Sequence, residues 1–284
     1  MSPVEVAERP GPGASPAALY LDLLKRCLTR FDFDPDLAPI VPGTPLKRRL
    51  WAQVATLLGR RDIVAFRRAP YESWRRQEGR DWPISAETMV GLRRLDNLQA
   101  CIESVVGDSV PGDVLEAGVW RGGAAILMRA VLASLQETGR TVWVADSFQG
   151  LPKPKDEHLA DRDDLHWSQP FLAVSQDEVK QNFTRYGMLD RQVRFLAGWF
   201  SDTLADAPIE RLAVLRVDCD MYGSTIDVLS ALYPKVSIGG YAIVDDYGEI
   251  PNCRAAVDDY RAQHHITEPI RWIDGSGIFW RRQS

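Results

Sequence analysis

Two closely spaced pairs of aspartates are the residues of this sequence best suited to chemistry. Asp218 and Asp220 follow one short aliphatic segment, and Asp245 and Asp246 follow another. Four carboxylates gathered in one crevice repel one another and cannot all stay ionised unless a cation compensates them. Oxygen ligands favour Mg²⁺, with Ca²⁺ or Mn²⁺ as substitutes, and argue against Zn²⁺, which prefers His and Cys. The sequence therefore predicts a site for a divalent metal ion.

Two buried parallel strands must position these aspartates. Residues 212–217 and 241–244 are mainly aliphatic runs, typical of strands covered on both faces. Residues 223–234 predict a crossover helix, and Gly239-Gly240 is expected to turn the chain into the second strand. Because such a crossover is right-handed, the carboxyl ends of both strands are expected at the same edge of the sheet.

An earlier strand, residues 114–119, runs into a glycine turn at residues 120–123 and then into an apolar helix. This arrangement lets the backbone approach a nucleotide-like ligand. The glycine spacing after Gly118 is not the GxGxxG of a dinucleotide site, and Glu116 would repel a pyrophosphate. We therefore expect Glu116 to suit a ligand that carries an ammonium group.

Two further strand ends are expected to complete this ligand site. Asp146, with Ser147 beside it, follows the strand at residues 141–145 and is placed to accept hydrogen bonds from ribose hydroxyls. The strand at residues 193–197 is followed by Trp199, which is suited to stack on a purine, with a core position as the alternative.

Residues 150–174 contain three prolines and dense charge without periodicity. Connections of this length are uncommon inside a domain and are often lids. We expect this segment to be a lid that is mobile when the site is empty, with a static surface insertion as the alternative. A capping box that begins at Ser175 then opens the next helix.

The rest of the chain predicts an N-terminal helical region and a C-terminal hairpin. Residues 1–16 are expected to be disordered, and residues 17–108 show apolar residues at helical spacing, with Ser85 as the N-cap of the last helix. Two apolar segments flank a turn at residues 274–277. The predicted fold is α/β: a Rossmann-like sandwich over residues 109–284, with a mostly parallel seven-stranded sheet closed by an antiparallel hairpin.

Composition indicates an ordinary globular chain. Its 284 residues are 45% hydrophobic and 26% charged, which is enough for one large core. The net charge of −5 offers no basic surface to nucleic acid or to a membrane, and we expect neither partner. No signal peptide or membrane span is expected. The four cysteines form no CxxC pair, which predicts a reducing cytoplasm.

Six motifs occur in the order found in one family of enzymes. They are Tyr20 to Lys25, Met89 to Leu98, Leu115 to Gly123, Asp146 to Pro152, Asp218 to Tyr222 and Val244 to Gly248. The chain resembles class I S-adenosylmethionine-dependent methyltransferases and, more narrowly, the macrocin and mycinamicin O-methyltransferase family, which includes novobiocin-pathway members. The resemblance runs from about Ala17 to the end, and residues 32–80 depart from the family pattern.

The resemblance implies an Mg²⁺-dependent O-methyltransferase that acts on a deoxysugar of a glycosylated natural product. It implies metal ligands at Asp218, Asp245 and Asp246, with Asp220 as the proposed base, although Asp220 as a ligand is the alternative. It also implies that the chain forms a homo-oligomer, with the N-terminal helices as candidates for the contact. The residues expected to bind S-adenosylmethionine are Met89, Glu116, Ala117, Gly118, Asp146, Ser147 and Trp199.

Two other enzyme classes share part of this pattern. A catechol or phenol O-methyltransferase uses the same metal chemistry. Phosphatases of the haloacid dehalogenase type also place Asp-x-Asp and Asp-Asp at strand ends around Mg²⁺. Here, however, Tyr222 stands where such a phosphatase has Thr or Val, and the motif follows three earlier strands. A catalytically silent binding module would have lost the aspartates, and all four are present.

Overall fold

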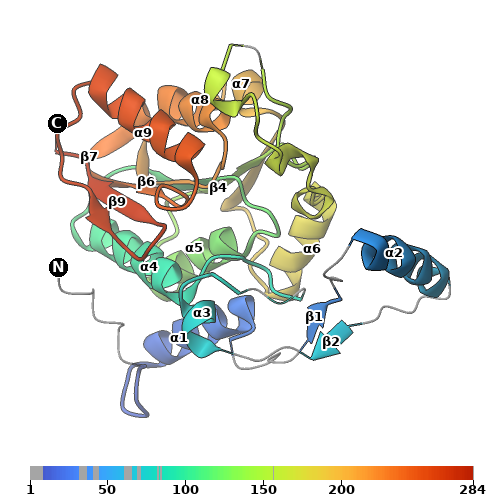
Figure 1. Ribbon diagram of the computed structural model, residues 1–284. Coiled ribbons are helices and arrows are strands. Elements are labelled where there is room, and N and C mark those ends of the chain that lie inside the picture. Colours follow the sequence, from blue (N-terminus) through green and yellow to red (C-terminus); the bar gives the residue numbers. More distant parts are fainter. Residues whose placement is uncertain are drawn as a thin grey trace.

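A seven-stranded sheet forms the centre of the molecule (Figure 1). The computed structural model describes residues 9–31, 37–40, 45–60, 66–68, 72–81, 83, 85–155 and 157–283. The strands of the sheet are β3 (Asp113–Ala117), β4 (Val142–Asp146), β5 (Val193–Ala197), β6 (Leu212–Val217), β7 (Val236–Val244), β8 (Arg271–Trp272) and β9 (Ile278–Arg281).

The order of the strands is β5-β4-β3-β6-β7-β9-β8. The first five in this order are parallel, and β9 pairs antiparallel with β7 and β8. The chain runs outward from β3 to β5 and then returns to β6 on the other side of β3. A crevice opens outside the carboxyl ends of the strands where the order reverses. The predicted α/β sandwich with its antiparallel C-terminal pair is confirmed.

Alternation along the strands builds two cores, one on each face of the sheet. Val114 and Val142 belong to one core, and their neighbours Leu115 and Trp143 belong to the other. The helices of the first face are α1 (Pro16–Thr29), α4 (Leu92–Gly107), α5 (Gly123–Ser134) and α6 (Gln176–Arg185). Those of the opposite face are α7 (Phe200–Thr203), α8 (Tyr222–Leu232) and α9 (Pro251–Gln263) (Figure 1).

Helix α4 begins six residues later than the sequence predicts, because its N-cap is Gly91 and not Ser85. The preceding residues use their backbone groups in tertiary contacts, because Glu87 N donates to Leu28 O and Glu87 O accepts from Gly123 N. A helix through this segment would lose those bonds. The prediction at Ser85 is therefore wrong, and residues 85–91 pack beside the glycine turn instead.

Two further features of the chain differ from expectation. Strand β7 starts at Val236, so Gly239-Gly240 lies within it, where the register against β6 shifts. The segment 150–174 is not free of regular structure. It contains three short 3₁₀ helices, η1 (Leu159–Asp161), η2 (His166–Ser168) and η3 (Pro170–Leu172). A fourth, η4 (Tyr233–Lys235), follows α8.

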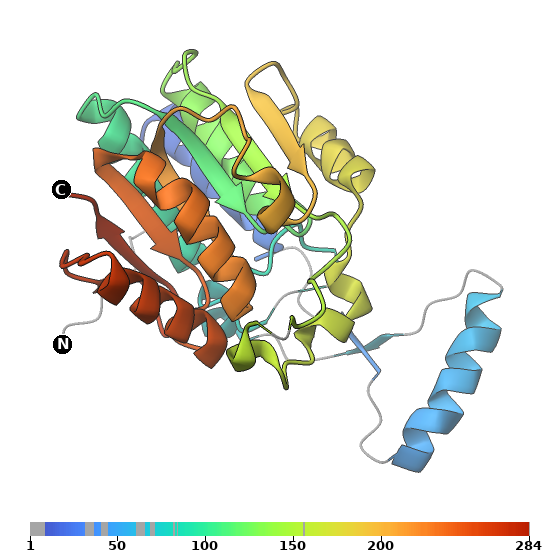
Figure 2. The same ribbon diagram turned by 90° about the horizontal axis from the view of Figure 1, so that it is seen from above.

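The N-terminal region contains a small sheet that the sequence did not predict. Strands β1 (Leu37–Pro39) and β2 (Phe66–Arg68) pair antiparallel and flank α2 (Pro45–Gly59), which stands away from the body of the molecule (Figures 1 and 2). Helix α3 (Ser73–Gln77) leads back toward α4. Part of the predicted disordered start, residues 1–8, lies outside the described residues. Within the described part of the chain, no helix has the length and apolarity needed to cross a membrane.

Candidate active site

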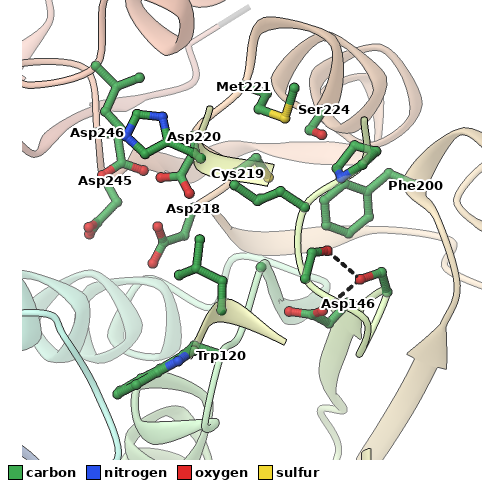
Figure 3. A pocket seen from close by; sticks show the side chains of 18 of the residues that line it. Trp120, Asp146, Phe200, Asp218, Cys219, Asp220, Met221, Ser224, Asp245 and Asp246 are labelled. Atoms are coloured by element: carbon green, nitrogen blue, oxygen red, sulfur yellow. Dashed lines mark hydrogen bonds between the residues drawn. The ribbon is translucent and has the colours of Figure 1, made fainter. Parts of the chain in front are cut away.

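One cavity of about 740 Å³ opens at the carboxyl ends of the central strands. Figure 3 shows the aspartates of β6 and β7 at one side of it and Asp146 at the other. Of the predicted site residues, Ala117 does not line the cavity, because its side chain is buried in the core. The predicted residues that line the cavity are Met89, Glu116, Gly118, Asp146, Ser147, Trp199, Asp218, Asp220, Asp245 and Asp246.

The glycine turn after β3 approaches the end of β6 so closely that a side chain is excluded. Gly118 has φ +82°, and a Cβ there would lie well under 3.0 Å from the Asp218 carbonyl oxygen. Gly122, with φ +85°, is the N-cap residue of α5. This turn therefore presents its backbone to the cavity and brings the end of β3 against that of β6.

Asp146 holds the glycine turn in place. Its Oδ2 accepts from Val119 N at 2.8 Å, and its Oδ1 accepts from Phe148 N at 2.7 Å. Burial raises the pKa of Asp146, and these backbone donors oppose the rise. Ser147 Oγ donates to Gly150 O at 2.7 Å, which fixes the start of the next segment. The Asp146 carboxylate also lines the cavity.

Three carboxylates converge at one end of the cavity. Single oxygens of Asp218, Asp220 and Asp246 all lie within 4.8 Å of one another. Removal from solvent and the charge of Asp218 raise the pKa of Asp220 to about 7. Asp220 has φ +57°, so the backbone turns sharply between the strand and α8. Such a cluster of oxygen donors has the chemistry of a site for a hard cation.

Asp245 points differently from the other three aspartates. Its Oδ2 accepts from Arg94 Nη1, and its Oδ1 accepts from Arg216 Nη2. The side chain of Arg94 also reaches Asp274, with Nε 3.0 Å from Oδ2. The structure thus joins Asp245 to two arginines and leaves it outside the group of three carboxylates.

Arg216 links the two sides of the cavity, and the sequence analysis missed it. Its side chain is 1% exposed, and its Nη1 donates to Glu116 Oε1 at 2.5 Å and to Asp218 Oδ2 at 2.8 Å. Burial raises the pKa of Glu116 to about 8, and Arg216 opposes the rise. A signal was present, because an arginine inside a buried aliphatic strand needs charged partners.

The predicted lid forms part of the cavity wall. Trp120 Nε1 donates to Phe171 O at 2.8 Å, which ties the glycine turn to this segment. Trp199, at the N-cap of α7, and Phe200 line the cavity nearby. Met89 lines it from residues 85–91, beside the glycine turn. The described contacts therefore surround a single space in which a nucleoside ligand and an acceptor can meet.

Fold and site together define a class I O-methyltransferase. The model of the family described as "Macrocin-O-methyltransferase (TylF)" matches residues 17–282. The chain belongs to this family, whose reaction implies S-adenosylmethionine as the methyl donor. The predicted family, fold class and enzyme class are confirmed, and the phosphatase and silent-module alternatives are excluded.

Similar proteins span most of the chain. Demethyldecarbamoylnovobiocin O-methyltransferase of Streptomyces niveus is 54% identical over 224 residues, which are 78% of this chain and 86% of the relative. Mycinamicin III 3''-O-methyltransferase of Micromonospora griseorubida is 48% identical over 270 residues, 94% of this chain and 97% of the relative. The solved structure of the O-methyltransferase NovP superposes with a TM-score of 0.80 at 46% identity, covering 94% of this chain and 100% of that chain.

Proposed function

We propose that the protein transfers a methyl group from S-adenosylmethionine to a deoxysugar hydroxyl of a glycosylated natural product, with Mg²⁺ as the metal. The observation that carries this proposal is the single cavity shared by the glycine turn and the carboxylate cluster. The substrate class follows the name of the relative mycinamicin III 3''-O-methyltransferase, in which 3'' denotes a position on a sugar of the acceptor.

The donor set fits Mg²⁺. The clustered ligand atoms of Asp218, Asp220 and Asp246 are all carboxylate oxygens, and Mg²⁺ is bound by oxygen ligands. We propose Asp218, Asp245 and Asp246 as the ligands. Asp245 remains in this set although each of its oxygens accepts a hydrogen bond from an arginine. A carboxylate oxygen that accepts one such bond keeps a second lone pair, which could bind a metal ion.

Asp220 is proposed as the base. A base for a metal-bound hydroxyl must lie beside the metal, and the closeness of Asp220 to Asp218 and Asp246 meets this requirement. When bound, the metal would lower the pKa of a chelated sugar hydroxyl. Asp220 would take the hydroxyl proton as the oxygen gains the methyl group and the bond between that methyl and the sulfonium sulfur breaks. No covalent enzyme intermediate is needed, so the remaining task is positioning.

The cofactor side is proposed to act through shape and charge. Gly118 allows close approach of the ligand to the backbone, and Asp146 is proposed to accept hydrogen bonds from the ribose hydroxyls. Glu116 is proposed to face the ammonium group. Trp199 and Met89 would bound the rest of the cofactor, and residues 150–174 would exclude water from the reacting atoms.

Isothermal titration tests the cofactor and metal assignments together. S-adenosylhomocysteine should bind the wild type, and Asp146→Ala should weaken that binding. Asp218→Asn and Asp246→Asn should weaken Mg²⁺ binding while leaving a folded protein. Wild-type protein that binds S-adenosylhomocysteine but no Mg²⁺ would overturn the metal assignment and leave the methyltransferase assignment intact.

The chain is also proposed to form a homo-oligomer in a reducing cytoplasm. Helix α2 exposes Leu46, Leu50, Val54 and Leu57 at helical spacing, with 45–70% of each residue accessible. An apolar face of this kind on a helix that stands away from the body suits burial against a second copy. All four cysteines are free thiols, which agrees with a reducing compartment.

A further inference from the structure

Helix α8 starts directly after the turn that carries Asp218 and Asp220, yet it lacks a local cap. Met221 occupies the N-cap position and makes no side-chain hydrogen bond. The first N–H groups of a helix have no partner within the helix and must be satisfied from outside it. At this helix the donors in question are the backbone N–H groups of Tyr222 and Gly223.

Asp161 supplies the missing cap from the middle of the lid. Its Oδ1 accepts from Tyr222 N at 2.8 Å, and its Oδ2 accepts from Gly223 N at 2.8 Å. The residue is 2% exposed, although it lies in a polar surface segment. A negative charge at this position is also favoured by the dipole of α8. Both carboxylate oxygens of Asp161 therefore bind the N-terminus of α8, which begins beside the carboxylate cluster.

The first turn of α9 adds a second attachment. Asn252 Nδ2 lies 3.1 Å from both Asp161 Oδ1 and Asp164 Oδ2. Asp164 Oδ1 in turn accepts from His166 N at 2.6 Å, and His166 lines the cavity. Figure 2 shows this yellow-green part of the chain next to the adjacent ends of α8 and α9. Residues 157–168 are thus held against two helix N-termini at the mouth of the site.

We propose that Asp161 is a positioning residue that couples closure of the lid to the placement of Asp218 and Asp220. The backbone of Asp220 has φ +57°, a region that residues with a side chain rarely adopt. The carboxylate of Asp161 fixes the start of α8, which follows Asp220 in the chain. When the lid opens, Tyr222 N and Gly223 N lose Asp161 as their acceptor, and the turn that carries Asp218 and Asp220 loosens. The closed lid and the ordered turn therefore occur together.

The hydrogen bonds from Tyr222 N and Gly223 N to Asp161, here called the latch, are observed in the structure. The effect of this latch on metal binding rests on the proposed function. The glycine turn lies on the other side of the cavity and is held by Asp146. The lid is tied to that turn through Trp120 Nε1 and Phe171 O, so cofactor affinity should depend on Asp161 less than Mg²⁺ affinity and acceptor affinity do. Acceptor binding, Mg²⁺ binding and turnover should depend on it, and this separation distinguishes a positioning residue from one that only stabilises the fold.

The test compares Asp161→Asn with Asp163→Asn in the full-length protein. The first variant keeps one acceptor oxygen but turns an amide donor toward a backbone N–H. The second removes a charge from an exposed residue of the same segment. Loss of a helix cap corresponds to a change of roughly 5-fold in the opening equilibrium. Trypsin cleavage after the exposed Arg162, expressed relative to that of a peptide with the same flanking residues, should accelerate by about this factor in Asp161→Asn only.

Three further readouts complete the comparison. In Asp161→Asn, exchange of the Tyr222 and Gly223 amides should accelerate, Mg²⁺ affinity should fall by a similar factor, and the acceptor KM should rise. Affinity for S-adenosylhomocysteine should fall by a smaller factor than affinity for Mg²⁺. Asn252→Ala, which leaves both bonds to α8 intact, should show a smaller effect and serves if Asp161→Asn does not fold.

Unchanged cleavage after Arg162 and unchanged amide exchange in Asp161→Asn would overturn the latch. Faster cleavage with wild-type amide exchange at Tyr222 and Gly223 would overturn the coupling, because the lid would then open without loosening the turn. If wild-type protein bound no Mg²⁺, the proposed metal would fail, and the cleavage and exchange results would still decide the role of Asp161.

Discussion

Replacing Gly118 by alanine tests whether the contact between the glycine turn and β6 shapes the site. An alanine Cβ would overlap the main-chain oxygen of Asp218, and neither partner is a side chain that can rotate away. Gly187 is a matched control, because it also has positive φ (+67°) but a Cβ there meets nothing within 4 Å. Left-handed backbone costs an alanine about 1–2 kcal/mol at either position.

The overlap at Gly118 adds to that backbone cost. Forced overpacking typically costs about 1–3 kcal/mol, so Gly118→Ala should lower the free energy of unfolding by about 2–5 kcal/mol and Gly187→Ala by about 1–2 kcal/mol. Urea unfolding followed by circular dichroism measures both. Relief of the overlap would move the end of β3, and with it the glycine turn, away from β6. Affinity for S-adenosylhomocysteine should therefore fall in Gly118→Ala alone. Equal destabilisation of the two variants with unchanged affinity would refute the reasoning.

Four other predictions follow from the site and the N-terminal helix. Asp146→Ala should weaken S-adenosylhomocysteine binding in calorimetry, and unchanged affinity in a folded variant would remove Asp146 from the site. Residues 150–174 should gain hydrogen-exchange protection when cofactor and acceptor bind, whereas equal protection would make them a static insertion. Asp220→Asn should lower turnover by about 10²–10⁴-fold without weakening Mg²⁺ or cofactor binding; recovery of activity on adding Mg²⁺ would make Asp220 a ligand instead. Leu50→Asp with Leu57→Asp should reduce the mass measured by light scattering, and an unchanged mass would exclude α2 from the contact.

Features encoded by adjacent residues were predictable from the sequence. The aliphatic runs before Asp218 and Asp245 specify strands because buried parallel strands need apolar residues on both faces. Their carboxyl ends share one edge because crossovers are right-handed. These local rules placed the aspartates of both strands in one cavity with Asp146.

Features that depend on distant partners were not predictable. Arg94 contacts Asp245 across 151 residues, and no spacing in the sequence connects them. Ser85 has the chemistry of an N-cap, but the backbone of the next residues is used by α1 and the glycine turn. Asp161 is one of several acidic residues in a polar segment, and only the position of α8 distinguishes it.

The most direct test of the account is methyl transfer to a glycosylated acceptor with and without metal. The protein is incubated with S-adenosylmethionine and either 6-deoxyhexosyl natural products or catechols, and the products are fragmented in a mass spectrometer. We predict a mass increase of one methylene on the sugar fragment, abolished by a chelator and restored by Mg²⁺. Methylation of the aglycone or of a catechol, or transfer that persists in the chelator, would contradict the account.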